Sequence, residues 1–393
     1  MLWLLVSFSV SLLASWLMIT RMPKLSKWMH DQDLDGVQKF HAHPTPRTGG
    51  VAVMFGILGA FFVALAVAPA LASFLGLLLV SGLPVFAGGL VEDLTKQVKP
   101  RYRLLLAFAS AALAFLLMDA AVTRLDLPWL DSLLEISAVS LVFTLFAVGA
   151  TTHAVNIIDG FNGLMLGYAM LALGVLAWVA YQQQDLLILQ TCGLVIASIA
   201  GLFVFNYPRG RIFAGDAGAC FIGFLLCELT VLVVARNPGV SSWFALLVLI
   251  YPVTEVAFSV YRRKILRSVA ATDPDAKHLH TLIYRRYVRF RCNPRANRCA
   301  ARLNASTSKY LWVLTLVSLL PAAIFWNDSL SLLLFCSVFV AAYITCYWKI
   351  VRFRFYGRSK VRSEPAQVPR AVVDHQRRTS SESVDAKPVS STT

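Results

Sequence analysis

Residues that could do chemistry stand out in this chain because almost everything around them is apolar. The segment AVNIIDGFNGLMLGY places Asn156, Asp159 and Asn162 between two apolar runs, with no lysine or arginine. The carboxylate of Asp159 can bind a cation or anchor a charge, and each amide can both donate and accept hydrogen bonds. These groups suit the edge of a uracil-type ring or a sugar hydroxyl better than a bare metal ion.

A second polar stretch, GLVEDLTKQVKPRYRL, places two neighbouring carboxylates, Glu92 and Asp93, at the end of an apolar run. Adjacent carboxylates repel each other and are costly near a bilayer, and a divalent cation or a bound proton would relieve that cost. Four bases suited to phosphate oxygens follow: Lys96, Lys99, Arg101 and Arg103. The alternative interpretation is an ordinary solvated loop of acids and bases.

The third stretch, NYPRGRIFAGDAGACFIGF, sets Asp216 at the start of an apolar run rich in small residues. An acid at a helix N-terminus can be only a cap. Arg209 and Arg211 precede it, and their charges also allow a site for a metal and a diphosphate.

Two further stretches carry bases and histidines. In HPTPRTGG, Arg47 can fork onto a phosphate, and Gly49 and Gly50 leave backbone amides free to approach a bound group. In KHLHTLIYRR, His278 and His280 are two residues apart and do not share a helix face, so hydrogen bonds to a diphosphate are favoured over zinc. For both stretches the alternative is ordinary cytoplasmic positive charge.

The elements that must position these residues are membrane helices. Only 15% of the 393 residues are charged and 58% are hydrophobic, with a mean hydropathy of +0.66, whereas soluble domains carry about 25% charged residues. A spanning helix needs about 20 apolar residues. Eleven runs qualify, at approximately 2–20, 49–68, 71–90, 104–122, 136–154, 163–181, 186–205, 217–235, 242–260, 310–326 and 330–348. We therefore expect an all-α polytopic membrane protein with about 11 transmembrane helices.

The positive charges predict the orientation. With the N-terminus outside (periplasmic) and the C-terminus cytoplasmic, all but two of the 36 Lys and Arg residues, Arg124 and Arg236, fall on the inner side. Every polar cluster then lies on the cytoplasmic face, and the net charge of +15 points to anionic lipid and phosphate substrates, not to nucleic acid.

The chain divides into a multi-span membrane domain, 1–348, and a basic tail, 349–393, which we expect to be disordered and dispensable for activity. The cytoplasmic loops expected to form the site are 21–48, 91–103, 155–162, 206–216 and 261–309. These five loops lie on one side and carry carboxylates and bases suited to phosphate. Together they predict a site where a soluble diphosphate meets a lipid phosphate.

The ordered motifs HPTPRTGG, EDLTKQVKPRYRL, NIIDGFNGL, GDAGACFIG and KHLHTLIYRR resemble those of the polyprenyl-phosphate N-acetylhexosamine-1-phosphate transferases. The motif PTPRTGG is similar to the branch that initiates antigen synthesis. Two positions depart from the family pattern: Glu92 replaces the first residue of an Asp-Asp pair, and Asn162 replaces the second acid of DGxDG. The lost charge puts an obligatory metal or base role for Asn162 in doubt.

The resemblance implies that undecaprenyl phosphate attacks the β-phosphorus of a UDP-N-acetylamino sugar, giving a lipid diphosphate sugar and UMP at a bacterial inner membrane. It implies Mg²⁺, or Mn²⁺ in its place, held by Asp216 and Asp93 directly or through their neighbours, and it allows a homodimer. Catalytic roles then fall to four acids: Glu92, Asp93, Asp159 and Asp216. Substrate binding falls to Arg47, Arg103, Asn156, Asn162, His278 and His280.

Two rival functions remain open at this point. One is the phospho-MurNAc-pentapeptide transferase of peptidoglycan synthesis, although HLHT differs from the run of three histidines typical of that branch. The other is a transporter, because Glu228 lies near the middle of a span, where an ionisable residue indicates function. A transporter is disfavoured because the remaining polar clusters gather at one face and no inverted repeat is visible.

Overall fold

The computed structural model describes residues 1–25, 30–31, 45–264, 277–288 and 297–352. Contacts divide the chain into two units, Met1–Arg354 and Phe355–Thr393. The description below concerns the first unit. The predicted tail from residue 353 onward, and the start of the motif at His41, lie outside the described residues.

The described residues contain eleven helices long and apolar enough to cross a membrane, which confirms the predicted number. They are α1 (Leu2–Leu25), α2 (Gly49–Val67), α3 (Pro69–Thr95), α4 (Pro100–Met118), α6 (Ser137–Ile157), α7 (Leu164–Gln182), α8 (Leu186–Asn206), α9 (Gly215–Arg236), α10 (Ser242–Lys264), α12 (Asn297–Ile324) and α13 (Ser329–Arg352). Because each buries a largely apolar surface, the bundle forms one continuous hydrophobic core.

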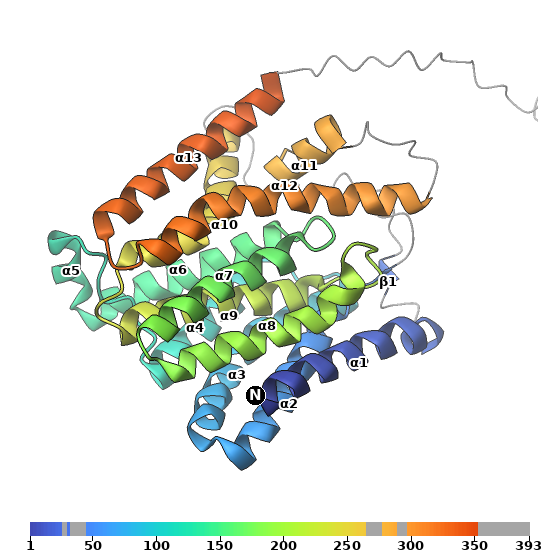
Figure 1. Cartoon of the computed structure of the whole chain (residues 1–393), viewed down its shortest axis with the longest axis horizontal. Helices are drawn as coiled ribbons and strands as arrows, with labels where there is room; N and C mark the ends of the chain where they lie inside the picture. Colours follow the sequence, from blue (N-terminus) through green and yellow to red (C-terminus); the bar gives the residue numbers. More distant parts are fainter. Residues whose placement is uncertain (26–29, 32–44, 265–276, 289–296, 353–393) are drawn as a thin grey trace, which may run out of the picture. The chain divides into compact units, whose positions relative to one another are not determined.

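Helix α9 is the central element of this bundle (Figure 1). In its most apolar stretch 94% of the residues are buried, a larger share than in any other described span. Helices α2, α3, α6 and α7 all pack against it. The N-terminal end of α9 therefore lies where several neighbouring helices also begin or end.

The structure differs from the predicted spans mainly where helices continue past the apolar run. Helix α12 begins at Asn297, not near residue 310, because Leu303 and Ala305 are buried and extend its packed face. A short helix, α5 (Pro128–Leu134), lies in the connection predicted at 123–135. The last large loop contains α11 (Leu279–Ile283) and a π-helical turn, η2 (Tyr284–Val288). Two-residue strands β1 (His30–Asp31) and β2 (Thr45–Pro46) pair antiparallel before α2.

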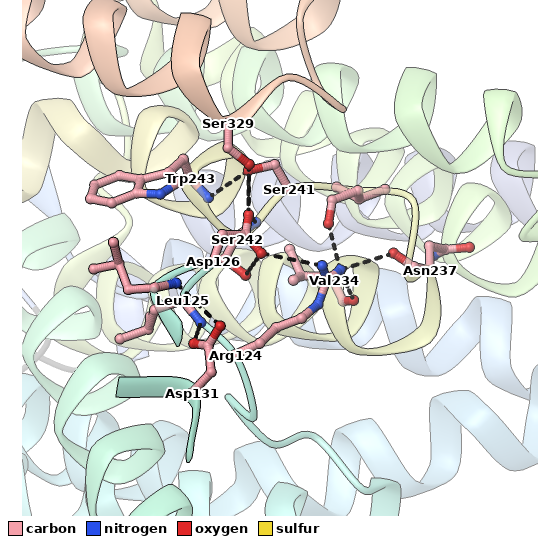
Figure 2. A network of polar contacts seen from close by, with 12 residues as sticks. Arg124, Leu125, Asp126, Asp131, Val234, Asn237, Ser241, Ser242, Trp243 and Ser329 are labelled. Carbon is pink, nitrogen blue, oxygen red and sulfur yellow. Dashed lines mark hydrogen bonds and ion pairs between the residues drawn. The ribbon is translucent and has the colours of Figure 1, made fainter. Parts of the chain in front are cut away.

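A polar network joins three connections at the end of the bundle where α9 finishes (Figure 2). Asp126, between α4 and α5, accepts hydrogen bonds from Ser241 Oγ at 2.7 Å and Ser329 Oγ at 2.9 Å. It also accepts one from the backbone N–H of Ser242 at 2.9 Å. One carboxylate thus ties together the starts of α10 and α13, far from the N-terminal end of α9.

Candidate active site

The N-terminal end of α9 is capped by a carboxylate from another helix. Both oxygens of Asp93, near the end of α3, accept backbone N–H groups: Oδ1 from Asp216 at 2.9 Å and Oδ2 from Ala217 at 2.8 Å. Gly215 has a φ of +73°, and a Cβ there would lie 2.1 Å from the carbonyl oxygen of Arg47. Only glycine therefore fits at this turn. Since the first N–H groups of a helix lack intrahelical partners, a buried carboxylate is a favourable cap.

Asp216, in the first turn of α9, lies within a ring of donors. Arg47 Nη2 is 3.3 Å from Asp216 Oδ2, and Arg103 Nη1 donates to Asp216 Oδ1. Asn156 Nδ2 donates to the same Oδ1 at 2.9 Å. We call Asp216, Asp93, Arg47, Arg103 and Asn156 the carboxylate centre. The centre combines two guanidinium groups with two acids. A guanidinium group that pairs with a carboxylate can also pair with a phosphate.

Close backbone packing brings these helices together. A Cβ at Gly50 would lie 2.2 Å from Gly218 N, and a Cβ at Gly89 would lie 2.5 Å from Ala217 Cα, so α2 and α3 approach α9 at backbone contact. The prediction that the amides of Gly49 and Gly50 face a bound group is wrong. They donate instead to the carbonyl oxygens of Phe213 and Ala214, at 2.9 and 2.8 Å, because the loop before α9 lies over the start of α2.

Glu92 has a different position from its neighbour Asp93. Its Oε2 accepts the backbone N–H of Val98 at 2.7 Å and so closes the turn between α3 and α4. Successive helical residues point about 100° apart, which allows Asp93 to face α9 while Glu92 holds the turn that leads to Arg103. Arg209 and Arg211, predicted beside Asp216, are exposed.

Asp159 follows the end of α6 and is electrostatically coupled to the carboxylate centre. Burial raises the pKa of Asp159 to about 7, the nearby guanidinium of Arg47 works to lower it, and the charge of Asp216 raises it further. Asp159 can therefore change its charge near neutral pH.

Asn162 is engaged by the chain itself. Its Nδ2 donates to the carbonyl of Pro208 at 3.2 Å, and its backbone N–H donates to Asn304 Oδ1 at 2.7 Å. Ser308 Oγ donates to its carbonyl at 2.7 Å. The side-chain amide of Asn162 therefore fastens the 159–163 loop to the turn before α9, and its backbone fastens the loop to α12. The predicted role in nucleotide binding stays a prediction.

The histidine segment reaches the same loop from the other side. The rings of His278 and His280 stack with centroids 5.3 Å apart. The His280 ring packs edge-to-face on Phe161 at 5.7 Å, and its Nε2 lies 3.2 Å from where a Cβ of Gly160 would be. Because Gly160 and Phe161 directly follow Asp159, the structure places both histidines beside the loop that adjoins the carboxylate centre.

One residue of this region, His153, was not predicted from the sequence. His153, on α6 one turn before Asn156, lies where the charges of both Arg103 and Asp216 act on it. Its Nε2 is buried and has no hydrogen-bond partner among the described residues. The spacing of three residues from Asn156 was the available signal, since residues i and i+3 share a helix face.

The carboxylate centre fits Mg²⁺ only in part. Among the described residues, no group of three or more His, Cys, Asp or Glu side chains is placed to hold a metal. Both oxygens of Asp93 accept N–H groups of α9, so Asp216 is the carboxylate of the two that is better placed to bind a metal ion. Mg²⁺ commonly takes one or two carboxylates together with substrate phosphates and water, so the residues present fit an ion that binds with a diphosphate.

These features define a class: a multi-span helical membrane protein with a polar centre of carboxylates and guanidinium groups where its helices converge. The family model for glycosyl transferase family 4 matches residues 74–234, a range that includes Asp93, Arg103, Asn156, Asp159 and Asp216. The chain is 25% identical over 276 residues to a probable undecaprenyl-phosphate N-acetylglucosaminyl 1-phosphate transferase of Bacillus subtilis (strain 168), covering 70% of this chain and 75% of that protein.

Two other relatives extend the comparison. An undecaprenyl-phosphate alpha-N-acetylglucosaminyl 1-phosphate transferase of Yersinia pestis is 27% identical over 64% of this chain and 69% of its own length. A phospho-N-acetylmuramoyl-pentapeptide-transferase of Lactobacillus delbrueckii subsp. bulgaricus (strain ATCC BAA-365 / Lb-18) is 30% identical over 58% of this chain and 75% of its own length. The chain belongs to glycosyl transferase family 4, the sugar-1-phosphate transferases of the membrane.

Proposed function

We propose that this enzyme transfers an N-acetylamino-sugar 1-phosphate from a UDP-sugar to undecaprenyl phosphate, releasing UMP. The observation that carries the proposal is the position of Asp216 at the start of α9, held between Arg47, Arg103 and Asn156. The relatives named undecaprenyl-phosphate N-acetylglucosaminyl 1-phosphate transferase support the same reaction.

The guanidinium groups supply the electrostatic part of catalysis. Arg47 and Arg103 pair with Asp216 and neutralise its charge. A bound diphosphate offers the same groups more oxygens and more charge, so either arginine can turn from Asp216 to the phosphates. Mg²⁺, when bound, would neutralise charge that develops on the diphosphate. The arginines would then stabilise the transferring phosphoryl group.

The nucleophile needs little activation by the protein. A phosphate monoester has a second pKa of about 6 and is largely ionised at neutral pH. Asp93 is poorly placed as a general base, because both of its oxygens already accept backbone N–H groups. This arrangement favours direct attack of the lipid phosphate on the β-phosphorus, with Asp93 positioning Asp216.

An apolar cavity of about 400 Å³ suits the lipid substrate. It is lined by α6, α9, α10 and the 121–130 connection, toward the end of the bundle where α9 finishes and away from the carboxylate centre, so it would hold a part of the lipid distant from the phosphate; its lining includes Phe143, Cys227, Leu246 and Leu249. A pocket of this size and polarity can accept part of a hydrocarbon chain.

We further propose that the carboxylate centre faces the cytoplasm at the bacterial inner membrane, where UDP-sugars are available. The positive-inside distribution of Lys and Arg supports this orientation. The product would begin an O-antigen or a related cell-surface polysaccharide, which is the reaction class of the antigen-initiating branch.

The test is UMP release by the purified full-length protein in detergent, with undecaprenyl phosphate, Mg²⁺ and UDP-N-acetyl sugars supplied one at a time. Release that requires the lipid and one particular sugar would support the proposal and name the donor. UDP-MurNAc-pentapeptide belongs in the panel, because the Lactobacillus relative favours that second candidate. Absence of UMP with every donor, from protein shown to be folded, would contradict the proposal.

A further inference from the structure

The histidine segment is tied to the bundle by a carboxylate that has no role in the reaction proposed above. Glu255, on α10, is only 1% exposed. Its Oε1 lies 3.0 Å from His278 Nδ1 and accepts the backbone N–H of Leu279 at 2.9 Å. Since Leu279 is the first residue of α11, one buried oxygen holds both the start of that helix and the imidazole beside it.

These two contacts determine the tautomer of His278. The Leu279 N–H donates to Oε1, so that oxygen acts as an acceptor and His278 Nδ1 carries the proton. A carboxylate bonded to one ring nitrogen fixes the orientation of the imidazole and with it the direction of the other nitrogen, Nε2.

The position of His278 also determines the surroundings of a second imidazole, that of His280. Its imidazole stacks on His280 with an interplanar angle of 11°. His280 in turn contacts Phe161 and approaches Gly160, the residues that follow Asp159. Glu255 therefore stands at the start of a contiguous series of contacts that ends at the loop beside the carboxylate centre.

The need to fill a buried space does not explain why residue 255 is a glutamate. Removing a carboxylate from water is costly unless partners compensate, and an apolar side chain would fill the space without that cost. Glu228 on α9 shows the contrast: it is equally buried, but both of its oxygens lack a hydrogen-bond partner among the described residues, whereas only Oε2 of Glu255 does. The two glutamates thus provide a matched pair, of which only Glu255 is coupled to the histidines.

We propose that Glu255 is a positioning residue that orients His278, and through it His280, for binding the diphosphate of the nucleotide sugar. The inference rests on the proposed function, since it assumes that the imidazoles meet that substrate. Glu255 does not itself touch the reacting atoms; it acts through the two rings.

The kinetic test compares Glu255→Leu with the matched control Glu228→Leu, by UMP release from the full-length protein. We expect Glu255→Leu to raise the KM for the UDP-sugar by about tenfold or more, the usual scale for removing an orienting carboxylate, while the KM for undecaprenyl phosphate changes little. Glu228→Leu should stay within about twofold of wild type for both substrates. Glu255→Gln keeps one carbonyl oxygen in place and should restore part of the loss.

A second readout does not depend on catalysis. In protein labelled with ¹⁵N-histidine, with the His278 signals assigned by comparison with His278→Gln, the wild type should show the Nδ1–H tautomer. Glu255→Leu should shift those signals, and Glu228→Leu should leave them unchanged. If the wild type releases no UMP, the proposed function fails while this spectrum still tests the geometry. Unchanged His278 signals in Glu255→Leu, or an equal rise of KM in both leucine variants, would overturn the proposal.

Discussion

At the scale of the residue, Asp216 is the acid to which three side chains of the carboxylate centre donate. The charge of Asp216 therefore holds both arginines in the carboxylate centre. We expect Asp216→Asn to lower turnover by at least about tenfold, the scale of losing one electrostatic stabiliser. The measurement is kcat from UMP release, with the melting midpoint as the check on folding. A folded variant with a rate near wild type would remove Asp216 from the centre of the mechanism.

Asp159 allows a prediction about pH, because its pKa is raised to about 7 by burial. A carboxyl group whose folded-state pKa exceeds its unfolded value keeps a proton that the unfolded chain has released. Its contribution to stability is complete at low pH and is lost as the pH rises through about 7. Asp159→Asn removes this penalty, so the melting midpoint of the variant relative to wild type should be higher at about pH 8 than at about pH 5.

The measurement is thermal unfolding in detergent at both pH values, with a chelator present so that no metal shifts the titration. The exposed Asp328→Asn, which lies at the other end of the bundle, is the control and should show no such trend. A constant difference between Asp159→Asn and wild type across this range would contradict the prediction.

At the scale of the element, the junction between α3 and α9 joins stability to function. Asp93 accepts two N–H groups at the start of α9, and the same turn carries Asp216. Asp93→Asn keeps one accepting oxygen and turns an amide donor toward the other N–H. We expect a loss of about 1–2 kcal/mol of stability, the scale of a helix cap, together with a fall in turnover of at least about tenfold.

A matched control separates the two effects. Asp185 is also a buried helix cap, since its Oδ1 accepts the N–H of Ile188 at 3.3 Å at the start of α8, and it pairs with Arg236 at 2.7 Å. Because Arg236 ends α9, this cap lies at the opposite end from Asp216. Asp185→Asn should lower the melting midpoint comparably and leave kcat unchanged. Equal losses of kcat in both variants would mean that general destabilisation, and not the position of Asp216, causes the effect.

At the scale of the whole molecule, hydrophobic run length predicted the eleven spans because a bilayer imposes that length on a helix. The helix ends were harder to predict, since a packed helix such as α12 continues beyond the apolar run wherever residues like Leu303 find a buried surface. The clustering of Arg103, Asn156 and Asp216 was expected because their loops fall on one side of the predicted topology.

Other features of the site depend on contacts that spacing does not reveal. Adjacent acids look alike in a sequence, and only the packing of α3 on α9 assigns Asp93 to the cap and Glu92 to the turn. Asn162 looked like a substrate ligand, but its amide and backbone fasten the 159–163 loop to neighbouring elements. Likewise, Glu255 and His278 are 23 positions apart, and sequence spacing does not predict a contact at that separation.

The proposed use of Mg²⁺ leads to a prediction that concerns the whole centre. Asp216 is occupied by two arginines and an amide, Asp93 caps α9, and no cluster of three potential ligands exists among the described residues. A diphosphate would draw the arginines away and add its own oxygens, so metal and nucleotide sugar should bind cooperatively. We expect Mg²⁺ alone to shift the melting midpoint little, and Mg²⁺ with the donor UDP-sugar to raise it by more than the two separate shifts combined. Asp216→Asn should lose that excess. A full shift with Mg²⁺ alone would instead mean that the protein holds the ion without substrate, with ligands beyond the carboxylate centre described here.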